Sequence, residues 1–232
     1  MTIDTPTFAT LRERVRDYAP QLQSDGRLSW REFERSYKAN PRTMKAEIIE
    51  GVVYVASSLR ADRGRLHGAI MTWLGQCQAA TPGTDRLDNT RTQMDADNEV
   101  HSGAMLRFAK KAGGQTCIDK GFVKGLPELV VESAVLSATI DLGDKKLAYC
   151  QAGVYECSVW QTSEQRLDWF ALSDGEYVPL ASDADGIARG QLFNSLGLAG
   201  TALPKDHIAA VLAPWQRRLS SAEHCAFSER TN

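Results

Sequence analysis

The amino-acid sequence predicts a single domain of the α/β class, in which helices flank a mixed β-sheet. Residues 128–160 follow the pattern strand, helix, strand, which is long enough for a right-handed crossover between parallel neighbours. Residues 62–81 carry apolar side chains at helical spacing until Pro82 and Gly83 end the pattern. Glycine and proline are scattered, and no internal repeat is present. These observations favour one domain.

Composition and charge narrow the class of protein. The 232 residues are 43% hydrophobic and 24% charged, which excludes fibrous and wholly disordered chains. Lys and Arg number 27 and Asp and Glu number 29, so the net charge is −2. Since no bulk positive field draws such a chain onto nucleic acid, any contact with nucleic acid must use a local patch.

Cellular location is predicted from what the sequence lacks. No apolar stretch approaches the roughly 20 residues that cross a bilayer, and the first residues lack the basic and apolar regions of a secretory signal. The five cysteines are scattered without CxxC spacing, so we expect neither a disulfide framework nor a zinc knuckle. We therefore expect a cytoplasmic protein without a membrane segment.

Local signals predict the elements in order. Ser29 and Glu32 have capping-box spacing and begin a helix that runs to about Asn40. Glu50 and Gly51 form the turn of a hairpin, and Asp62 caps the long helix. Strands are predicted at 90–94, 100–108, 128–133 and 154–160, a helix at 141–153, and an edge hairpin at 167–172 and 177–180. The polar tail after Pro214 is expected to fray.

Glu132 and Lys145 are the first candidates for chemistry. Glu132 stands where an apolar strand reaches its carboxyl end, the usual place for a site in open α/β sheets. Lys145 follows in the first turns of the crossover helix, from where its ammonium can lean toward Glu132. The alternatives are a solvated strand-end carboxylate and a surface ion pair between Lys145 and Asp141.

A longer pattern carries a family resemblance. The segments EIIEG, GRLHG, EVHSGAMLRF and LPELVVE occur in this order, and the last is followed by Asp141, Lys145, Tyr149, Gly153 and Val154 at the spacing D-x-x-x-K-x-x-x-Y-x-x-x-G-V. Over residues 27–203 the chain resembles the Uma-two family of the PD-(D/E)xK endonuclease superfamily. The resemblance implies a restriction-endonuclease-like domain at 27–203, between an extension at 1–26 and a helix or tail at 204–232.

The resemblance also implies a chemistry, hydrolysis of DNA phosphodiester bonds with Mg²⁺ or Mn²⁺. Carboxylates hold the metal, which activates a water, and a lysine steadies the nucleophile and the developing oxyanion. Carried over, Glu132 is the second carboxylate and Lys145 is the lysine. Glu47 or Glu50 matches the acidic position before the turn glycine, although both also fit solvated hairpin carboxylates.

One departure bears directly on this site. Where the family has Pro-Asp, this chain has Ser102 and Gly103, so the principal metal-binding aspartate is missing. Alternate residues of a strand share a face, so Glu99 and His101 point the same way as Gly103. His101 is a candidate replacement ligand, better suited to Mn²⁺ or Zn²⁺ than to Mg²⁺, and also fits an ordinary surface histidine.

Three further residues are weaker candidates. His67 matches a histidine that is frequent in relatives and faces either the site or a backbone hydrogen-bond partner. Arg63 and Arg65 are candidates for phosphate contacts, and the alternative is a solvated helix start.

Two functions therefore remain open from the sequence. The first is a divergent, weak metal-dependent DNA endonuclease with a weakly bound metal or none. The second is an inactive nuclease-fold protein that acts as a DNA-contact or assembly module, and a homodimer is the commonest assembly.

Overall fold

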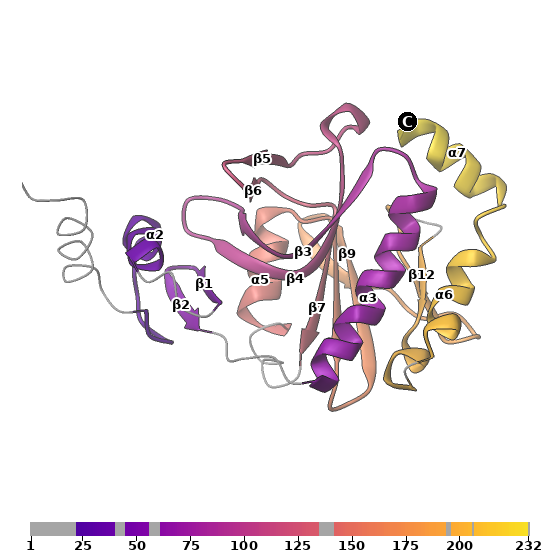
Figure 1. Ribbon diagram of the computed structural model, residues 1–232, viewed down its shortest axis with the longest axis horizontal. Helices are drawn as coiled ribbons and strands as arrows, with labels where there is room; N and C mark the ends of the chain where they lie inside the picture. The colour runs from indigo at the N-terminus through magenta and orange to yellow at the C-terminus, as the bar shows by residue number, and fades with distance from the viewer. Residues whose placement is uncertain are drawn as a thin grey trace, which may run out of the picture. The chain divides into compact units, whose positions relative to one another are not determined.

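The computed structural model describes residues 22–39, 45–55, 61–134, 142–193, 196–205 and 207–231. The chain divides into two compact units (Figure 1). The first unit comprises Met1–Ser58 and Asp95–His101, and the second comprises Leu59–Met94 and Ser102–Asn232.

The first unit is a helix packed on a hairpin. It contains α2 (Trp30–Ala39), β1 (Ala46–Ile49), β2 (Val52–Val55) and the first residues of β4 (Glu99–Phe108). The predicted capping box is present, because the Ser29 backbone N–H donates to Glu32 at 2.9 Å. Glu50 and Gly51 have positive φ values of 50° and 75°, which the tight turn between β1 and β2 requires. The predicted helix and hairpin are confirmed.

The second unit is built on a mixed sheet in the strand order β10-β9-β8-β7-β4-β3-β6-β5. Besides β4, its strands are β3 (Thr84–Gln93), β5 (Cys117–Asp119), β6 (Phe122–Lys124), β7 (Leu129–Ala134), β8 (Glu156–Gln161), β9 (Arg166–Ser173) and β10 (Glu176–Pro179). The pairs β7–β8 and β3–β6 are parallel, whereas β4–β7 and β8–β9 are antiparallel. The predicted parallel crossover and edge hairpin are confirmed.

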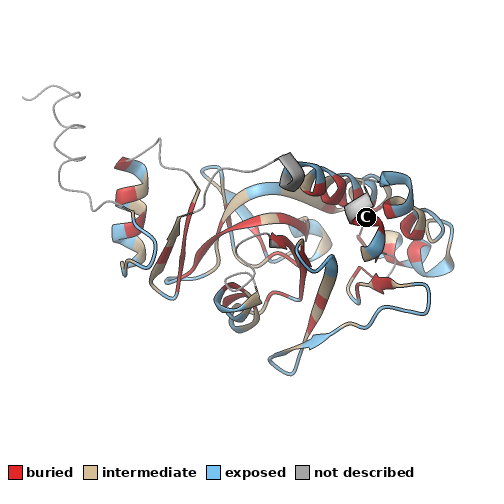
Figure 2. Ribbon diagram, turned by 90° about the horizontal axis from the view of Figure 1, so that it is seen from below, coloured by how far each residue is buried: buried red, intermediate tan, exposed pale blue. Residues whose placement is uncertain are grey.

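Helices cover both faces of this sheet. On one face lie α3 (Ala61–Ala80), α6 (Ile208–Gln216) and α7 (Ala222–Thr231), and on the other lies α5 (Asp144–Ala152) (Figures 1 and 2). Smaller elements are η1 (Lys110–Ala112), η2 (Gly200–Lys205) and the hairpin of β11 (Ile187–Arg189) and β12 (Gly197–Ala199). The main core lies between α3 and the sheet, where Trp73 and Trp169 meet edge to face with ring centroids 5.8 Å apart.

The expectation of a frayed tail after Pro214 was wrong. Pro214 lies within α6, and α7 follows as a packed helix. Phe227 is buried with its ring centroid 5.9 Å from that of Phe108, and His224 Nε2 lies 3.3 Å from the carbonyl oxygen of Ala80. The sequence did not reveal this packing because α7 buries only three side chains, those of His224, Phe227 and Thr231, and has no continuous apolar stripe.

Two other points concern the predicted elements. The short strands β5 and β6 lie between residues 108 and 128, a stretch for which the sequence predicted no strand. The Asp62 side chain and residue Asp141 lie outside the described residues. Among the helices that the structure describes, none is both long enough and apolar enough to cross a bilayer.

Candidate functional site

Glu132 and Gly103 face each other across neighbouring strands of the second unit. The antiparallel register of β4 and β7 pairs Ala104 with Val131, which places Gly103 beside Glu132. The Gly103 backbone N–H donates a hydrogen bond to Glu132 Oε2 at 3.1 Å. The two positions that the family resemblance assigns to metal ligands are therefore adjacent in the structure.

Two side chains of α5 reach the other oxygen of the same carboxylate. Lys145 Nζ lies 3.0 Å from Glu132 Oε1, and the Tyr149 hydroxyl donates to Oε1 at 2.9 Å. The Tyr149 hydroxyl also lies 3.0 Å from the Ser102 hydroxyl. The prediction that Lys145 points toward Glu132 with Tyr149 beside it is confirmed.

Local sequence explains why α5 presents these groups. The helix follows β7 in the crossover to β8, so its first turns lie near the carboxyl end of β7. Lys145 and Tyr149 are four residues apart and therefore share a helix face. Gly153, with φ of 96°, ends the helix in the left-handed conformation that glycine adopts without steric cost. The chain can then enter β8 beside β7.

We call Ser102, Gly103, Glu132, Lys145 and Tyr149 the buried cluster. The side chains of Lys145 and Glu132 are only 3% and 4% exposed, and Ser102 and Tyr149 are fully buried. A buried ion pair loses the hydration of both charges, so it is stable only when further hydrogen bonds satisfy the remaining groups. The Gly103 N–H and the Tyr149 hydroxyl provide those bonds to Glu132.

The buried cluster does not fit a Mg²⁺ ion. Both oxygens of its one carboxylate already accept hydrogen bonds, and the Lys145 ammonium lies 3.0 Å from Oε1, where its charge opposes a second cation. Gly103 has no side-chain ligand atom, and a Cβ at this position would lie 3.1 Å from Glu132 Oε2 and 3.0 Å from the Val131 carbonyl oxygen. No group of three or more His, Cys, Asp or Glu that could hold a metal occurs in the described part of the chain.

The predicted acidic residues of the hairpin lie in the first unit. Glu47 is buried in β1, with Oε1 4.0 Å from Lys45 Nζ. Glu50 is exposed at the turn and exchanges two hydrogen bonds with Asn98: its N–H donates to Asn98 Oδ1 at 2.9 Å, and its Oε1 accepts from Asn98 Nδ2 at 2.8 Å. These bonds fix the turn, and the catalytic role of Glu50 stays a prediction.

His101 and Glu99 also lie in the first unit. His101 is buried, with its ring centroid 6.2 Å from that of Tyr37 on α2. Glu99 Oε2 accepts a hydrogen bond from the Trp30 indole at 3.0 Å. Both side chains thus contact α2, which accounts for their burial, and the role of His101 as a metal ligand stays a prediction.

The remaining predicted residues lie on α3. His67 Nε2 is 2.6 Å from Asp88 Oδ1 on β3, a carboxylate partner instead of the backbone partner considered from the sequence. Arg65 is exposed, whereas the Arg63 side chain lies outside the described residues. The phosphate contacts of Arg63 and Arg65 stay predictions.

Sequence reasoning missed two buried carboxylates, Glu128 and Glu156. Glu128 accepts hydrogen bonds from the backbone N–H groups of Phe108 at 2.8 Å and Gln115 at 3.3 Å. Glu156 accepts from the backbone N–H groups of Gln191 and Leu192 at 2.7 and 2.5 Å and from the Trp169 indole at 2.9 Å. Burial raises the pKa of both carboxyl groups. The sequence could have indicated both residues, because each is an acidic residue within an apolar strand pattern.

The comparisons with known proteins agree with this geometry. Residues 30–201 match the Uma2 family, described as "Putative restriction endonuclease". A crystal structure from Anabaena variabilis ATCC 29413, described as "a putative nuclease belonging to DUF820", is similar with a TM-score of 0.60 and 12% identity over 78% of this chain and 99% of that chain. At this identity the likeness shows the fold alone. No curated protein matches the chain. Because the family match covers most of the sequence, the chain belongs to the Uma2 family of restriction-endonuclease-like proteins.

Proposed function

We propose that this chain is a degenerate DNA endonuclease, which keeps the fold and the carboxylate–lysine pair of a nuclease but hydrolyses phosphodiester bonds very slowly. Family and fold support the nuclease class. The main support for a degenerate site is the position of Gly103 beside Glu132, because a glycine supplies no second carboxylate for a metal.

The size of the expected defect follows from electrostatics. Removing one preorganised contact to a transition state commonly costs about 10²–10³ in rate. Loss of a metal ligand lowers the rate further, because the site then binds the metal more weakly. We therefore expect the wild-type rate with Mg²⁺ to lie at least about 10²–10³ below that of an otherwise equal site with two carboxylates. Mn²⁺ is the alternative cofactor, because it is also suited to carboxylate oxygen ligands.

A second function is favoured by the occupied carboxylate. Lys145, Tyr149 and Gly103 already satisfy both oxygens of Glu132, so the buried cluster is stable without a metal. A protein with such a site is suited to contact DNA or to assemble with other chains without cleaving. The family alone does not separate this role from slow hydrolysis, since function depends on the site rather than on the fold.

Plasmid nicking distinguishes the two functions. Wild type and the variants Glu132→Gln and Glu164→Gln are compared with Mg²⁺ and with Mn²⁺, and metal binding is measured by calorimetry. Slow nicking that Glu132→Gln removes and the exposed control Glu164→Gln retains supports the degenerate endonuclease. Absence of both nicking and metal binding in folded wild-type protein supports the non-catalytic role. Robust wild-type cleavage would refute the degeneracy.

A further inference from the structure

The second unit carries a concentration of positive charge outside the buried cluster. Residues 110–124, here called the basic segment, contain four lysines and one aspartate, in a chain whose net charge is −2. The lysines are Lys110, Lys111, Lys120 and Lys124, and all four are exposed. A chain without a bulk positive field thus has a local cationic surface, which is the kind of surface that contact with a polyanion requires.

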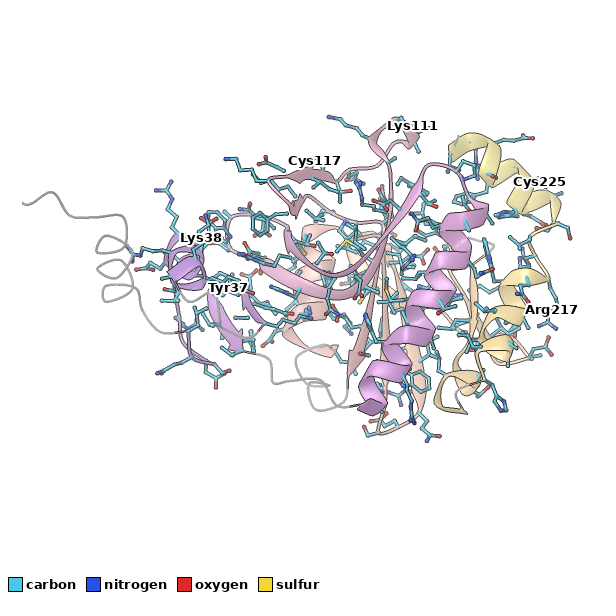
Figure 3. The ribbon with its side chains drawn as sticks, in the orientation of Figure 1. Tyr37, Lys38, Lys111, Cys117, Arg217 and Cys225 are labelled. Carbon is cyan, nitrogen blue, oxygen red and sulfur yellow. The ribbon has the colours of Figure 1, made fainter. Side chains whose placement is uncertain are left out.

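Hydrogen bonds and an ion pair hold the first part of the basic segment in place. Glu128 accepts hydrogen bonds from the N–H groups of Phe108 and Gln115, which closes the turn that contains Lys110 and Lys111. Arg107 donates to Thr116 Oγ1 at 2.9 Å and pairs with Asp85 at 3.1 Å. Because buried or partly buried groups anchor the turn, the two lysines are displayed from a defined backbone. Figure 3 shows Lys111 on this turn and Cys117 at the start of β5.

The rest of the basic segment is the β5–β6 hairpin at the edge of the sheet. Lys120 and Gly121, with φ values of 50° and 85°, form its turn, so Lys120 lies at the tip. On the neighbouring strand β3, the guanidinium of Arg91 lies 4.7 Å from the ring centroid of Phe122. This stacking orients a fifth positive group beside the hairpin.

Little of this charge is neutralised within the unit. Asp119 pairs with Lys124 at 2.8 Å, and this contact lowers the pKa of the Asp119 carboxyl. Lys110, Lys111 and Lys120 form no ion pair with the acidic side chains that the structure describes, although the charge of Lys120 also lowers the pKa of Asp119. Three exposed ammonium groups are therefore available to an external anion.

We propose that the basic segment is a binding surface for the sugar–phosphate backbone of duplex DNA, independent of base sequence. Lysine ammonium groups bind phosphates as point charges and carry no base readout. The choice of DNA over an anionic membrane as the polyanion rests on the proposed function, which the Uma2 membership supports. The surface lies on η1, β5 and β6 and uses no residue of the buried cluster, so binding does not require a working metal site.

The test measures DNA binding in EDTA, where metal-dependent hydrolysis is absent. Affinity for a random-sequence duplex is followed by fluorescence anisotropy against salt concentration, with wild type and the variant K110Q/K111Q/K120Q. Each lost phosphate contact lowers the slope of log K against log salt by about 0.9. We expect the triple variant to bind about tenfold or more weakly at moderate salt, with a slope smaller by about 2–3.

A matched control removes the same charge elsewhere. The variant R35Q/K38Q/R217Q also loses three exposed basic side chains, and we expect its affinity to stay within about twofold of wild type. Equal loss in both variants would reduce the effect to net charge and overturn the proposal. Loss confined to R63Q/R65Q would place the contact at the start of α3 instead.

Two further outcomes decide the class of partner. Wild-type protein that binds vesicles containing phosphatidylserine but no duplex DNA would overturn the proposal in favour of a membrane surface. Wild-type protein that binds neither would overturn it entirely. Because binding is measured in EDTA, where metal-dependent hydrolysis is absent, a failed cleavage assay and a failed binding assay are distinguishable.

Discussion

The Gly103 backbone N–H donates a hydrogen bond to Glu132 Oε2 at 3.1 Å, across the antiparallel pair of β4 and β7. This bond occupies the position at which the family resemblance predicts a carboxylate. The space beside residue 103 is also small, because an added Cβ would lie 3.0 Å from the Val131 carbonyl oxygen.

The variant Gly103→Ala should therefore destabilise the second unit. Closer packing than a core tolerates costs about 1–3 kcal/mol, which exceeds the roughly 0.5–1 kcal/mol that alanine gains over glycine in a regular element. Urea unfolding measures the difference. The control Gly68→Ala on α3 has nothing within 4 Å of the new Cβ and should be stabilising. An equal increase in the free energy of unfolding in both variants would show that residue 103 has room for a Cβ.

The variant Gly103→Asp should restore measurable metal-dependent nicking while lowering thermal stability. Its carboxylate supplies the missing ligand, and its Cβ meets the same close neighbours as that of alanine. We expect a gain of about 10² or more in nicking rate over wild type. The control Gly64→Asp adds the same charge at an open position on α3 and should leave the rate unchanged. A folded Gly103→Asp protein without activity would show that more than one ligand is lost.

Breaking the ion pair of Lys145 and Glu132 should be costly. Removal of one partner of a buried pair costs about 3–5 kcal/mol because the other charge is left uncompensated. We expect Lys145→Met to lose stability on this scale and Lys145→Met/Glu132→Gln to recover part of it, as measured by urea unfolding. The control Lys38→Met removes an exposed pair with Glu34 and should cost less than about 1 kcal/mol. A similar loss of unfolding free energy in the single variant, the double variant and the Lys38→Met control would show that the ion pair does not stabilise the protein.

The stability of the second unit should depend on pH through Glu156. Burial raises the folded-state pKa of Glu156 above its ordinary value of 4.5, so the folded state binds the proton more tightly than the unfolded chain. Its contribution to stability is complete below pH 4.5 and is lost as pH rises through the folded-state pKa. Relative to Glu156→Gln, wild type should gain Tm as pH falls from neutral toward 4.5.

Glu128→Gln provides an independent check of that pH dependence. Burial raises the pKa of Glu128 as well, so the same sign is expected for this variant. Thermal unfolding of wild type and both variants, followed by circular dichroism across this range, measures the two contributions. A wild-type Tm that does not rise relative to those of the two variants on acidification would show that neither carboxyl takes up a proton on folding.

Local patterns in the sequence determined most elements and one half of the site. Helical spacing predicted α3, the capping box predicted α2, and the strand–helix–strand pattern predicted both the parallel β7–β8 pair and the approach of Lys145 to Glu132. These features depend on neighbours within about 30 residues, for which periodicity and the handedness of crossovers are sufficient.

Only the tertiary structure decided the features that join distant segments. The packing of α7 through Phe227, the parallel pairing of β6 with β3, and the backbone donors of Glu128 and Glu156 come from separate parts of the chain. Local propensity does not encode which distant groups meet, because those contacts form only when the whole sheet and its helices bury their apolar faces together. Glu128 and Glu156 are therefore polar residues in an apolar pattern until the loops that donate to them are in place.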